Sequence, residues 1–318
     1  MTGPETVATY HRMVTIREFE NHAAQLRSRG TIICSLHLCN GQEAIAVGAR
    51  AALGPADTVN ATYRGHHWAI ACGTPIEALF GEFMGRETGI NGGRGGAGFF
   101  ADPDHGFLGE SGIVGGGVPI GVGAALASRY DGSGRVALTA FGDGALNQGA
   151  VHEAMTFAAI YRLPVVFVCE NNGYAEYTPT GSMSPAGALE RRAEVYGFPG
   201  VAVDGTDPRL VHAAVAEAVA RAREGGGPTL VVAGARRLGG HHTHDPEHYR
   251  PDGEKAAWAA EFDPIPKLRG VILESGLADD AALAQLEGDA RADVRAAALS
   301  AAAAPASDPA MLEQHVYA

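Results

Sequence analysis

Two short polar turns carry the strongest chemical signal in the sequence. Gly142-Asp143-Gly144 follows an apolar run at residues 136–141, and Asn171-Asn172 follows a second apolar run at residues 164–169. If these runs form neighbouring parallel strands, both turns lie at the edge of the sheet where ligands bind. A carboxylate and an amide oxygen suit Mg²⁺, which prefers oxygen ligands and commonly shares phosphate oxygens. The two turns therefore predict a site for magnesium and a phosphorylated ligand, whereas Gly-Asp-Gly alone would indicate an ordinary turn.

The residues around Asp143 favour close approach of a diphosphate. Gly142 and Gly144 have no Cβ atom, so their backbone can lie directly against a ligand. A helix is expected directly after this turn, opened by Ala145 and Asn147, and its first N–H groups would face the negative charge. The turn thus predicts a phosphate contact as well as a metal ligand.

Four further segments contain residues that could bind a ligand or take part in catalysis. They are Thr62-Tyr63-Arg64-Gly65-His66-His67, Ser111-Gly112-Ile113-Val114-Gly115-Gly116-Gly117, His37-Leu38-Cys39-Asn40-Gly41-Gln42-Glu43-Ala44 and Arg237-Leu238-Gly239-Gly240-His241-His242-Thr243-His244-Asp245. Taken singly, each has an ordinary interpretation, because Tyr-Arg is commonly a surface pair and most single histidines are structural. Their occurrence together in one chain favours a binding site.

Together these segments resemble the thiamine diphosphate-binding fingerprint, and nearly the whole chain resembles the alpha subunits of pyruvate, acetoin and branched-chain 2-oxo acid dehydrogenases. The resemblance implies that Asp143, Asn172 and the backbone oxygen of Tyr174 bind Mg²⁺. It also implies that Gly144 and Ala145 contact the diphosphate of the cofactor. The expected cofactors are therefore thiamine diphosphate and Mg²⁺.

The same resemblance assigns further cofactor contacts. Arg64 would pair with the terminal phosphate, for which its planar guanidinium is well suited, and the Tyr63 hydroxyl would donate a second hydrogen bond. The backbone of Gly112 and Val114 would contact the aminopyrimidine ring of the cofactor.

Two histidines are expected near the substrate. By resemblance, His37 faces the substrate side of the pocket, and His241 is the catalytic histidine and also contacts the cofactor. Because imidazole titrates near neutral pH, His241 could donate a proton or a hydrogen bond to the substrate carbonyl. His242 stands where many family members have a serine that a kinase phosphorylates, so this regulation is expected to be absent. Leu238-Gly239 replaces the aromatic or basic residues that are commoner there.

The resemblance also implies protein partners and a substrate class. In the two-gene dehydrogenases the carboxylate that activates the pyrimidine ring comes from a separate beta subunit, so we expect a heterotetramer of two alpha and two beta subunits. The substrate would be pyruvate, another 2-oxo acid or acetoin, and the acyl unit would pass to a lipoyl group on an acyltransferase. The run from Gly173 to Pro179 favours pyruvate or acetoin, while Gly240-His241-His242 is also similar to the branched-chain type.

An alternation of apolar runs and helical segments must position these residues. Strands are expected at residues 136–141, 164–169, 201–203 and 229–233, with helices at 119–130, 148–161 and 208–223. This order predicts an α/β fold with a doubly wound parallel sheet, of the thiamine diphosphate-binding type that the resemblance implies. Glycine is so frequent from residue 92 to residue 117 that we expect no regular structure there, but an ordered segment over a ligand.

Helices are expected at both ends of the chain. An amphipathic helix is predicted at residues 6–29, and two helices are predicted at residues 266–274 and 279–304. The Ala-rich C-terminal stretch has no visible chemistry and is expected to pack against a neighbouring subunit or the sheet. We therefore expect a single diphosphate-binding domain over residues 1–318, with 264–318 as a C-terminal helical extension.

Composition excludes several classes of protein. The formal net charge is −12, which argues against nucleic acid as a partner, because phosphate binding needs clustered Lys and Arg. No run approaches the roughly 18 apolar residues of a membrane helix. Residues 1–9 lack the basic and apolar regions of a secretory signal, and the four cysteines show no pairing pattern. We expect a cytoplasmic protein with reduced thiols.

Three other functions are compatible with parts of the sequence. A zinc hydrolase could use His241, His242, His244 and Asp245, although adjacent histidines on a glycine-rich loop rarely converge on one ion. A split transketolase-like enzyme would use the same cofactor on sugar phosphates, but the segments around His37 and His241 fit it less well. A cofactor-binding subunit without turnover is the third, and the joint presence of the catalytic and binding candidates argues against it.

Overall fold

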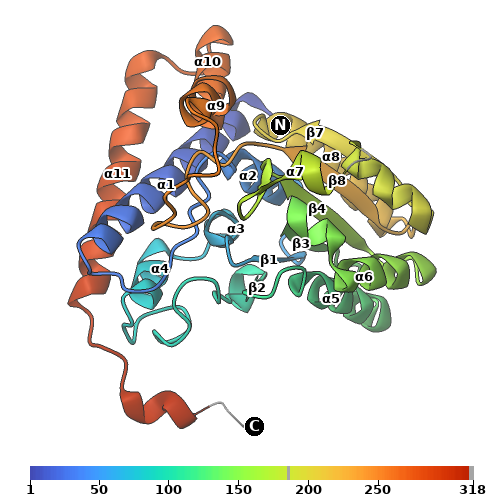
Figure 1. The fold of residues 1–318 in the computed structure, drawn as a ribbon, viewed down its shortest axis with the longest axis horizontal. Helices are drawn as coiled ribbons and strands as arrows, with labels where there is room; N and C mark the ends of the chain where they lie inside the picture. Colours follow the sequence, from blue (N-terminus) through green and yellow to red (C-terminus); the bar gives the residue numbers. More distant parts are fainter. Residues whose placement is uncertain (185–186, 315–318) are drawn as a thin grey trace.

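The computed structural model of the protein describes residues 1–184 and 187–314 and is built around a six-stranded parallel sheet (Figure 1). The strands of the sheet are β1 (Thr58–Thr62), β2 (Phe107–Ser111), β3 (Ala137–Gly142), β4 (Val165–Asn171), β7 (Gly200–Asp204) and β8 (Thr229–Gly234). Their order is β2-β1-β3-β4-β8-β7, and every neighbouring pair is parallel. A separate small hairpin consists of β5 (Tyr174–Ala175) and β6 (Thr178–Pro179).

Helices surround the sheet. The α-helices are α1 (Gly3–Ser28), α2 (Glu43–Ala51), α3 (His66–Cys72), α4 (Ile76–Phe83), α5 (Gly117–Asp131), α6 (Gly149–Ile160), α7 (Thr180–Met183), α8 (Pro208–Arg223), α9 (Glu254–Phe262), α10 (Pro264–Glu274) and α11 (Asp280–Ala303). Short 3-10 helices are η1 (Pro103–His105), η2 (Asp143–Asn147), η3 (Leu189–Tyr196) and η4 (Pro309–Glu313). Within the described ranges, no helix combines the length and the apolar character needed to span a bilayer.

Alternate residues of the central strands enter two separate cores. In β4, Val166 and Val168 belong to the core that includes α2 and α8, whereas Val165, Phe167 and Cys169 belong to the core that includes α5 and α6. Both faces of the strand are therefore buried, which explains its continuous apolar run. The predicted α/β fold with a parallel sheet and terminal helices is confirmed, as are the strands expected at the four apolar runs.

Two expectations about local structure are wrong. The glycine-rich stretch 92–117 is not free of regular structure, because it contains β2, which pairs with β1, and the first residue of α5. The helix expected to open at Ala145 and Asn147 begins instead at Gly149. Residues 143–147 form η2, and the extended backbone of Gln148 (φ −81°, ψ 137°) separates it from α6.

The order of strands changes direction between β1 and β3. From β1 the chain passes outward to β2, and from β3 it passes the opposite way to β4 and β8. Ligands of open α/β sheets bind at such a point, outside the carboxyl ends of the strands. Arg64 follows β1, Asp143 follows β3 and Asn172 follows β4, so the fold brings the predicted turns to one edge of the sheet.

The C-terminal helix packs on other helices. Figure 1 shows α11 lying along α1 and α4, and it buries Leu283, Ala290 and Val294. The C-terminal stretch was expected to pack against a neighbouring subunit or the sheet. The expectation of packing on the sheet is wrong for α11, because its apolar face lies against α1 and α4. Beyond α11, the Ser307 N–H donates to the carbonyl oxygen of Gly85 (3.0 Å). The Ser307 hydroxyl donates to the carbonyl oxygen of Gly92 (2.6 Å), which ties this segment to the start of the glycine-rich stretch.

One buried carboxylate orders the glycine-rich stretch. Glu82 is 1% exposed, and its oxygens accept hydrogen bonds from the N–H groups of Asn91 (2.8 Å), Gly93 (2.8 Å), Gly95 (2.6 Å) and Gly96 (3.1 Å). Backbone N–H groups need acceptors when they are removed from water. The Glu82 carboxylate thus replaces the ladder of hydrogen bonds that a strand or helix would supply.

Glu82→Ala is expected to lower the free energy of unfolding by about 2–4 kcal/mol, because several N–H groups lose their acceptor at once. Amide hydrogen exchange should accelerate at residues 91–96 more than in the sheet. Glu87→Ala is the matched control, since Glu87 is exposed, and it should change stability by less than about 0.5 kcal/mol. Unchanged protection of residues 91–96 in Glu82→Ala would contradict this account.

Candidate active site

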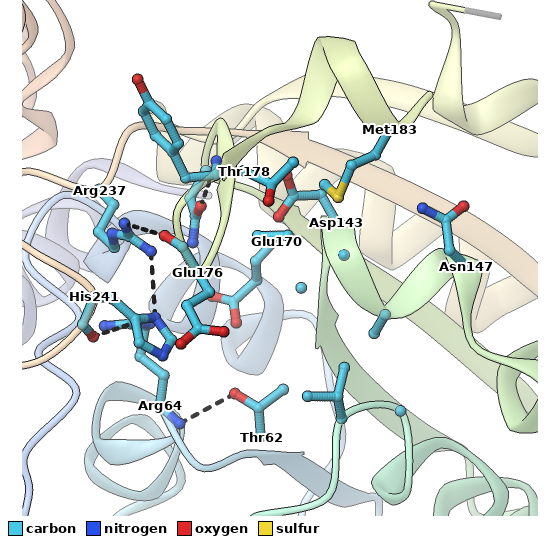
Figure 2. Close-up of a pocket in the computed structure, with 18 of the residues that line it drawn as sticks. Thr62, Arg64, Asp143, Asn147, Glu170, Glu176, Thr178, Met183, Arg237 and His241 are labelled. Atoms are coloured by element: carbon cyan, nitrogen blue, oxygen red, sulfur yellow. Dashed lines mark hydrogen bonds between the residues drawn. The ribbon is translucent and has the colours of Figure 1, made fainter. Parts of the chain in front are cut away.

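A cavity of about 330 Å³ opens at the carboxyl edge of the sheet (Figure 2). Its walls come from the turns after β1, β3, β4 and β8, from the loop before α5 and from the β5–β6 hairpin. The predicted site residues among its lining are Tyr63, Arg64, Val114, Asp143, Gly144, Ala145, Asn172, Tyr174 and His241. The fold therefore brings most of the predicted residues to one place, while Gly112 and His37 lie outside this lining.

The two polar turns supply oxygen atoms to the cavity. Asp143 is 2% exposed, and burial raises the pKa of its carboxyl group, which accepts a hydrogen bond from the Thr180 hydroxyl. Asn172 donates from Nδ2 to Oε1 of Gln42 (3.1 Å), and its Oδ1 accepts the N–H of Tyr174 (3.2 Å). One carboxylate and one amide oxygen are thus available for a hard cation such as Mg²⁺.

The hairpin lies directly on the Gly-Asp-Gly turn. A Cβ atom on Gly144 would be 2.5 Å from the Cβ atom of Ala175 in β5, so a side chain at this position is excluded. The next residue, Ala145, is 3% exposed and also lines the cavity. Close packing of the hairpin against this turn requires the glycine and places the backbone of 143–145 in the cavity wall.

Two buried guanidinium groups line the cavity, and neither has an ion-pair partner among the residues that the structure describes. Arg64 is 5% exposed and donates to the carbonyl oxygens of Leu38 (2.6 Å) and His241 (2.9 Å). Arg237 is 1% exposed and donates to the carbonyl oxygen of Glu176 (2.8 Å) and to the Tyr249 hydroxyl (2.6 Å).

Burial and the charge of Arg237 lower the pKa of Arg64. In residues 1–184 and 187–314, neither Arg64 nor Arg237 forms a salt bridge. Buried charges are costly unless they are compensated, so this wall of the cavity is suited to an anion. Figure 2 shows Arg64, Arg237 and His241 on one side of the cavity and Asp143 on the other.

Three predicted residues form an aromatic cluster beside the cavity. The ring centroid of His37 lies 4.9 Å from that of His241 and 4.6 Å from that of Tyr63. Burial and the Arg64 charge lower the pKa of His241 to about 3 and that of His37 to about 2. Both imidazoles are therefore neutral near pH 7.

The proton of His241 has a defined place. Its Nδ1 atom lies 3.4 Å from an Nη atom of Arg64 and 3.5 Å from an Nη atom of Arg237. Because guanidinium nitrogens can only donate, Nδ1 must accept, and the single proton of the neutral ring is on Nε2. His241 is thus arranged as a hydrogen-bond donor through Nε2. The backbone N–H of His241 donates a hydrogen bond to the carboxylate of Asp245 (2.6 Å).

The loop before α5 exposes apolar side chains next to the cavity. Val114, which lines it, is 47% exposed, and Ile113 is 76% exposed. Gly112 is exposed, and a Cβ atom there would lie 3.2 Å from the ring of Phe99, itself 55% exposed. The predicted pyrimidine contacts are thus on an open, apolar part of the surface.

The lining residues that were not among the predicted site residues include Gln42, Glu170, Glu176 and Arg237. Glu170 is 3% exposed, and its carboxylate pairs with Nε2 of His67 (2.7 Å). Glu176 has a positive φ of 52°, which is strained for a residue other than glycine, and Figure 2 shows its side chain directed into the cavity. The sequence offers one signal for them, namely that Gln42 and Arg237 belong to segments already chosen for His37 and His241.

The lowered pKa values of His37 and His241 predict acid sensitivity. An ordinary histidine has a pKa near 6.5, so between that value and about 3 the unfolded chain binds a proton that native His241 does not. Stability therefore falls as the pH drops below about 6.5, by on the order of 1–2 kcal/mol per histidine between pH 7 and pH 5. Urea unfolding at both pH values should show this loss, and His241→Gln should reduce it. His248→Gln, a control at an exposed position, should keep the wild-type difference; an identical difference in His241→Gln would contradict the assignment.

The histidine-rich loop is not arranged as a zinc site. The ring centroids of His241 and His242 are 5.9 Å apart, and those of His242 and His244 are 6.3 Å apart. Across the described part of the chain, no group of three His, Cys, Asp or Glu side chains is placed to hold a metal ion. This geometry weakens the interpretation as a zinc hydrolase.

Comparisons with known proteins match nearly the whole length of the chain. A family profile described as dehydrogenase E1 component matches residues 11–310. The alpha subunit of an acetoin:2,6-dichlorophenolindophenol oxidoreductase from Bacillus subtilis (strain 168) is 40% identical over 274 residues, covering 86% of this chain and 82% of that one. The Cupriavidus necator protein of the same name is 39% identical over 314 residues, covering 98% and 94%. The alpha subunit of a pyruvate dehydrogenase E1 component from Rhizobium meliloti (strain 1021) is 38% identical over 287 residues, covering 90% and 82%.

Proposed function

The chain belongs to the dehydrogenase E1 component family, and we propose that it is the alpha subunit of a two-chain, thiamine diphosphate-dependent dehydrogenase. The enzyme decarboxylates pyruvate or another 2-oxo acid, or cleaves acetoin, and passes the acyl unit to a lipoyl group on an acyltransferase partner. Pyruvate and acetoin are the leading substrates, because the relatives are named for them.

The observation that carries this proposal is the distribution of charge in the cavity. Arg64 and Arg237 are buried cations that pair with no carboxylate in the described part of the chain, and Asp143 faces them from the opposite wall. A diphosphate needs cations, and a magnesium ion bound to it needs oxygen ligands, so one cavity meets both requirements. The residues present therefore fit magnesium and thiamine diphosphate.

The proposed cofactor contacts are those that the family resemblance implies, and the positions of the lining residues support them. We assign Asp143, Asn172 and the backbone oxygen of Tyr174 to Mg²⁺, and Arg64 and the Tyr63 hydroxyl to the terminal phosphate. All five residues line the cavity. Arg64 has a planar donor group that matches phosphate oxygens.

Backbone contacts complete the proposed binding site. Gly144 and Ala145 lie in the cavity wall and would meet the diphosphate. Val114 lines the cavity and Gly112 lies two residues before it on the exposed loop, and we assign both to the aminopyrimidine ring.

The histidines act on the substrate in this proposal. Thiamine diphosphate held by the cavity residues would supply the carbanion chemistry needed at the substrate carbonyl. His241, with its proton on Nε2, donates a hydrogen bond to the carbonyl oxygen as negative charge develops there. Burial, together with the charges of Arg64 and Arg237, lowers the pKa of His241 and keeps its imidazole neutral. We assign His37, whose ring contacts that of His241 edge-on, to the substrate side of the pocket.

A beta subunit is proposed to cover the open side of the cavity. Phe99 (55% exposed), Ile113 (76%), Val114 (47%) and Ile120 (55%) gather on and beside the loop at its mouth, and such apolar surface favours a protein partner. The name "subunit alpha" of the relatives supports a partner chain. We further propose a heterotetramer of two alpha and two beta subunits.

The proposal also includes the domain organisation and the cellular location of the protein. Residues 1–318 are treated as one diphosphate-binding domain with a C-terminal helical extension. A cytoplasmic location is proposed, because the four cysteines have free thiols, of which three are buried, and such thiols suit a reducing compartment.

The test is to purify this chain alone and together with the beta-type protein encoded nearest to it. Reduction of 2,6-dichlorophenolindophenol is followed with pyruvate, acetoin and branched 2-oxo acids, with and without thiamine diphosphate and Mg²⁺. Activity is expected only with both chains and both cofactors, and chelation of Mg²⁺ should abolish it. Turnover of sugar phosphates would favour the transketolase-like alternative, and absence of thiamine diphosphate binding by calorimetry would overturn the proposal.

A further inference from the structure

Gln42 is a buried residue in the wall of the cavity, and it is not among the residues assigned to cofactor, metal or substrate. It precedes the first residue of α2, is 1% exposed and lines the cavity. Its position is fixed from both sides, because the Glu43 carboxylate accepts the N–H of Gly41 (2.8 Å) and the Nε–H of Arg17 (2.5 Å). A rigid backbone at this point gives the Gln42 side chain a defined reach.

The only side chain that Gln42 is hydrogen-bonded to, within the described residues, is Asn172. Asn172 Nδ2 donates to Gln42 Oε1 (3.1 Å), and Asn172 Oδ1 accepts the N–H of Tyr174 (3.2 Å). Both groups are buried, with Asn172 6% exposed. The nitrogen end of the Asn172 amide is therefore held by Gln42, and the oxygen end is turned toward the Tyr174 backbone.

This orientation matters because the two ends of an amide are nearly the same in shape and opposite in polarity. Only the oxygen end can bind a cation, whereas the –NH₂ end carries partial positive charge. If the amide turned over, Nδ2 would face the N–H of Tyr174, donor against donor, and Oδ1 would face Gln42. Oδ1 and the Oε1 atom of Gln42 would then meet acceptor against acceptor, so the Tyr174 N–H and Gln42 Oε1 together select the cation-binding orientation.

We propose that Gln42 is a positioning residue that holds the Asn172 amide with its oxygen toward the metal. This inference rests on the proposed function, in which Asn172 is a ligand of the magnesium ion. Residues that orient a metal ligand typically change metal affinity by about 10–100-fold when they are removed. Gln42 acts through Asn172 and is not assigned a contact with cofactor or substrate.

The test measures metal binding rather than turnover. Wild-type enzyme, copurified with its beta chain and saturated with thiamine diphosphate, is titrated with Mn²⁺ as a paramagnetic substitute for Mg²⁺, and free Mn²⁺ is measured by electron paramagnetic resonance. Gln42→Met keeps the length of the side chain and removes the acceptor, and it is expected to weaken Mn²⁺ binding about 10–100-fold. Gln42→Glu keeps an acceptor in the same place and is expected to bind Mn²⁺ no more weakly than wild type.

A double-mutant cycle separates orientation from general packing. In Asn172→Asp both ends of the side chain are oxygen, so no orientation has to be selected. Adding Gln42→Met to this variant should therefore change Mn²⁺ affinity by less than about 3-fold. The same substitution in a chain that retains Asn172 should weaken Mn²⁺ binding about 10–100-fold.

The outcomes are distinct. Equal losses in the two backgrounds, wild-type affinity in Gln42→Met, or a more than 10-fold loss in Gln42→Glu would each overturn the inference. If the wild-type complex binds neither Mn²⁺ nor thiamine diphosphate, the proposed function itself is wrong.

Discussion

Asp143→Ala, made in the two-chain enzyme, is expected to lower kcat/KM by about 10³-fold, which corresponds to about 4 kcal/mol. Asp143 supplies the only carboxylate among the three proposed magnesium ligands, so its loss leaves two neutral oxygens for a doubly charged ion. The measurements are dye reduction with pyruvate and acetoin, and calorimetric titration with thiamine diphosphate in the presence of Mg²⁺. Both turnover and cofactor binding should fall.

The stability of the ligand-free protein distinguishes this effect from misfolding. Burial raises the pKa of Asp143, so the folded state binds its proton more readily than the unfolded chain does, and the ionised carboxylate opposes folding at neutral pH. Asp143→Ala should accordingly unfold at the same or a higher temperature than wild type. A variant with low activity and a clearly lower Tm would contradict the assignment to the metal.

Asp204→Asn is the matched control for Asp143. Asp204 ends β7, another parallel strand, but its carboxylate is bonded to the N–H (2.9 Å) and the hydroxyl (2.6 Å) of Thr206 in its own turn, and it does not line the cavity. The activity of the Asp204→Asn enzyme should stay within about 2-fold of wild type. An equal loss at both positions would show that any acidic residue at this edge of the sheet matters.

His241→Ala is expected to lower kcat by about 10²–10⁴-fold, the range for removal of a positioned proton donor. The neutral ring carries its proton on Nε2 because Arg64 and Arg237 donate toward Nδ1. Affinity for thiamine diphosphate should change much less than kcat, since the arginines and the magnesium ligands remain. Steady-state kinetics with both substrates, together with cofactor titration, separate the two effects.

The control for His241 lies on the same loop. His248 is exposed and outside the cavity lining, and His248→Ala should retain wild-type kcat. A kcat in His241→Ala within about 3-fold of wild type would remove the histidine from the mechanism. A large fall in cofactor affinity at unchanged kcat would instead assign it to binding alone.

The central strands were predictable because burial on both faces makes them apolar throughout. β1 and β2 were not, since their sequences are Thr-Val-Asn-Ala-Thr and Phe-Leu-Gly-Glu-Ser. Asn60 is tolerated inside β1 because its side chain donates to the carbonyl oxygen of Gly117 (2.6 Å), and Glu110 in β2 accepts the N–H of Phe100 (2.9 Å). These partners are distant in sequence or lie in the irregular loop, so local composition hides both strands.

The candidate site divides in a similar way. Asp143 and Asn172 stand in short turns whose spacing and strand context suggested their chemistry, whereas Arg64 was assigned from the family resemblance of its segment. The roles proposed for Gln42 and Arg237 depend on properties that arise only in three dimensions. These are a buried amide facing another amide, and a buried cation that forms no salt bridge within residues 1–184 and 187–314. No pattern of neighbouring residue types encodes either property.

The packing of α11 along α1 bears on how the chain folds as it is made. The two helices are separated by more than 250 residues of sequence, and the apolar face of α1 includes Tyr10, Met13 and Phe19, each 0% exposed in the finished structure. A nascent chain must therefore keep that face covered by other means until residues 280–303 have left the ribosome. Contacts of such long range slow folding and prolong exposure of apolar surface. We expect newly synthesised chains to depend on chaperones chiefly through α1, because α11, which covers part of its buried face, is translated more than 250 residues later.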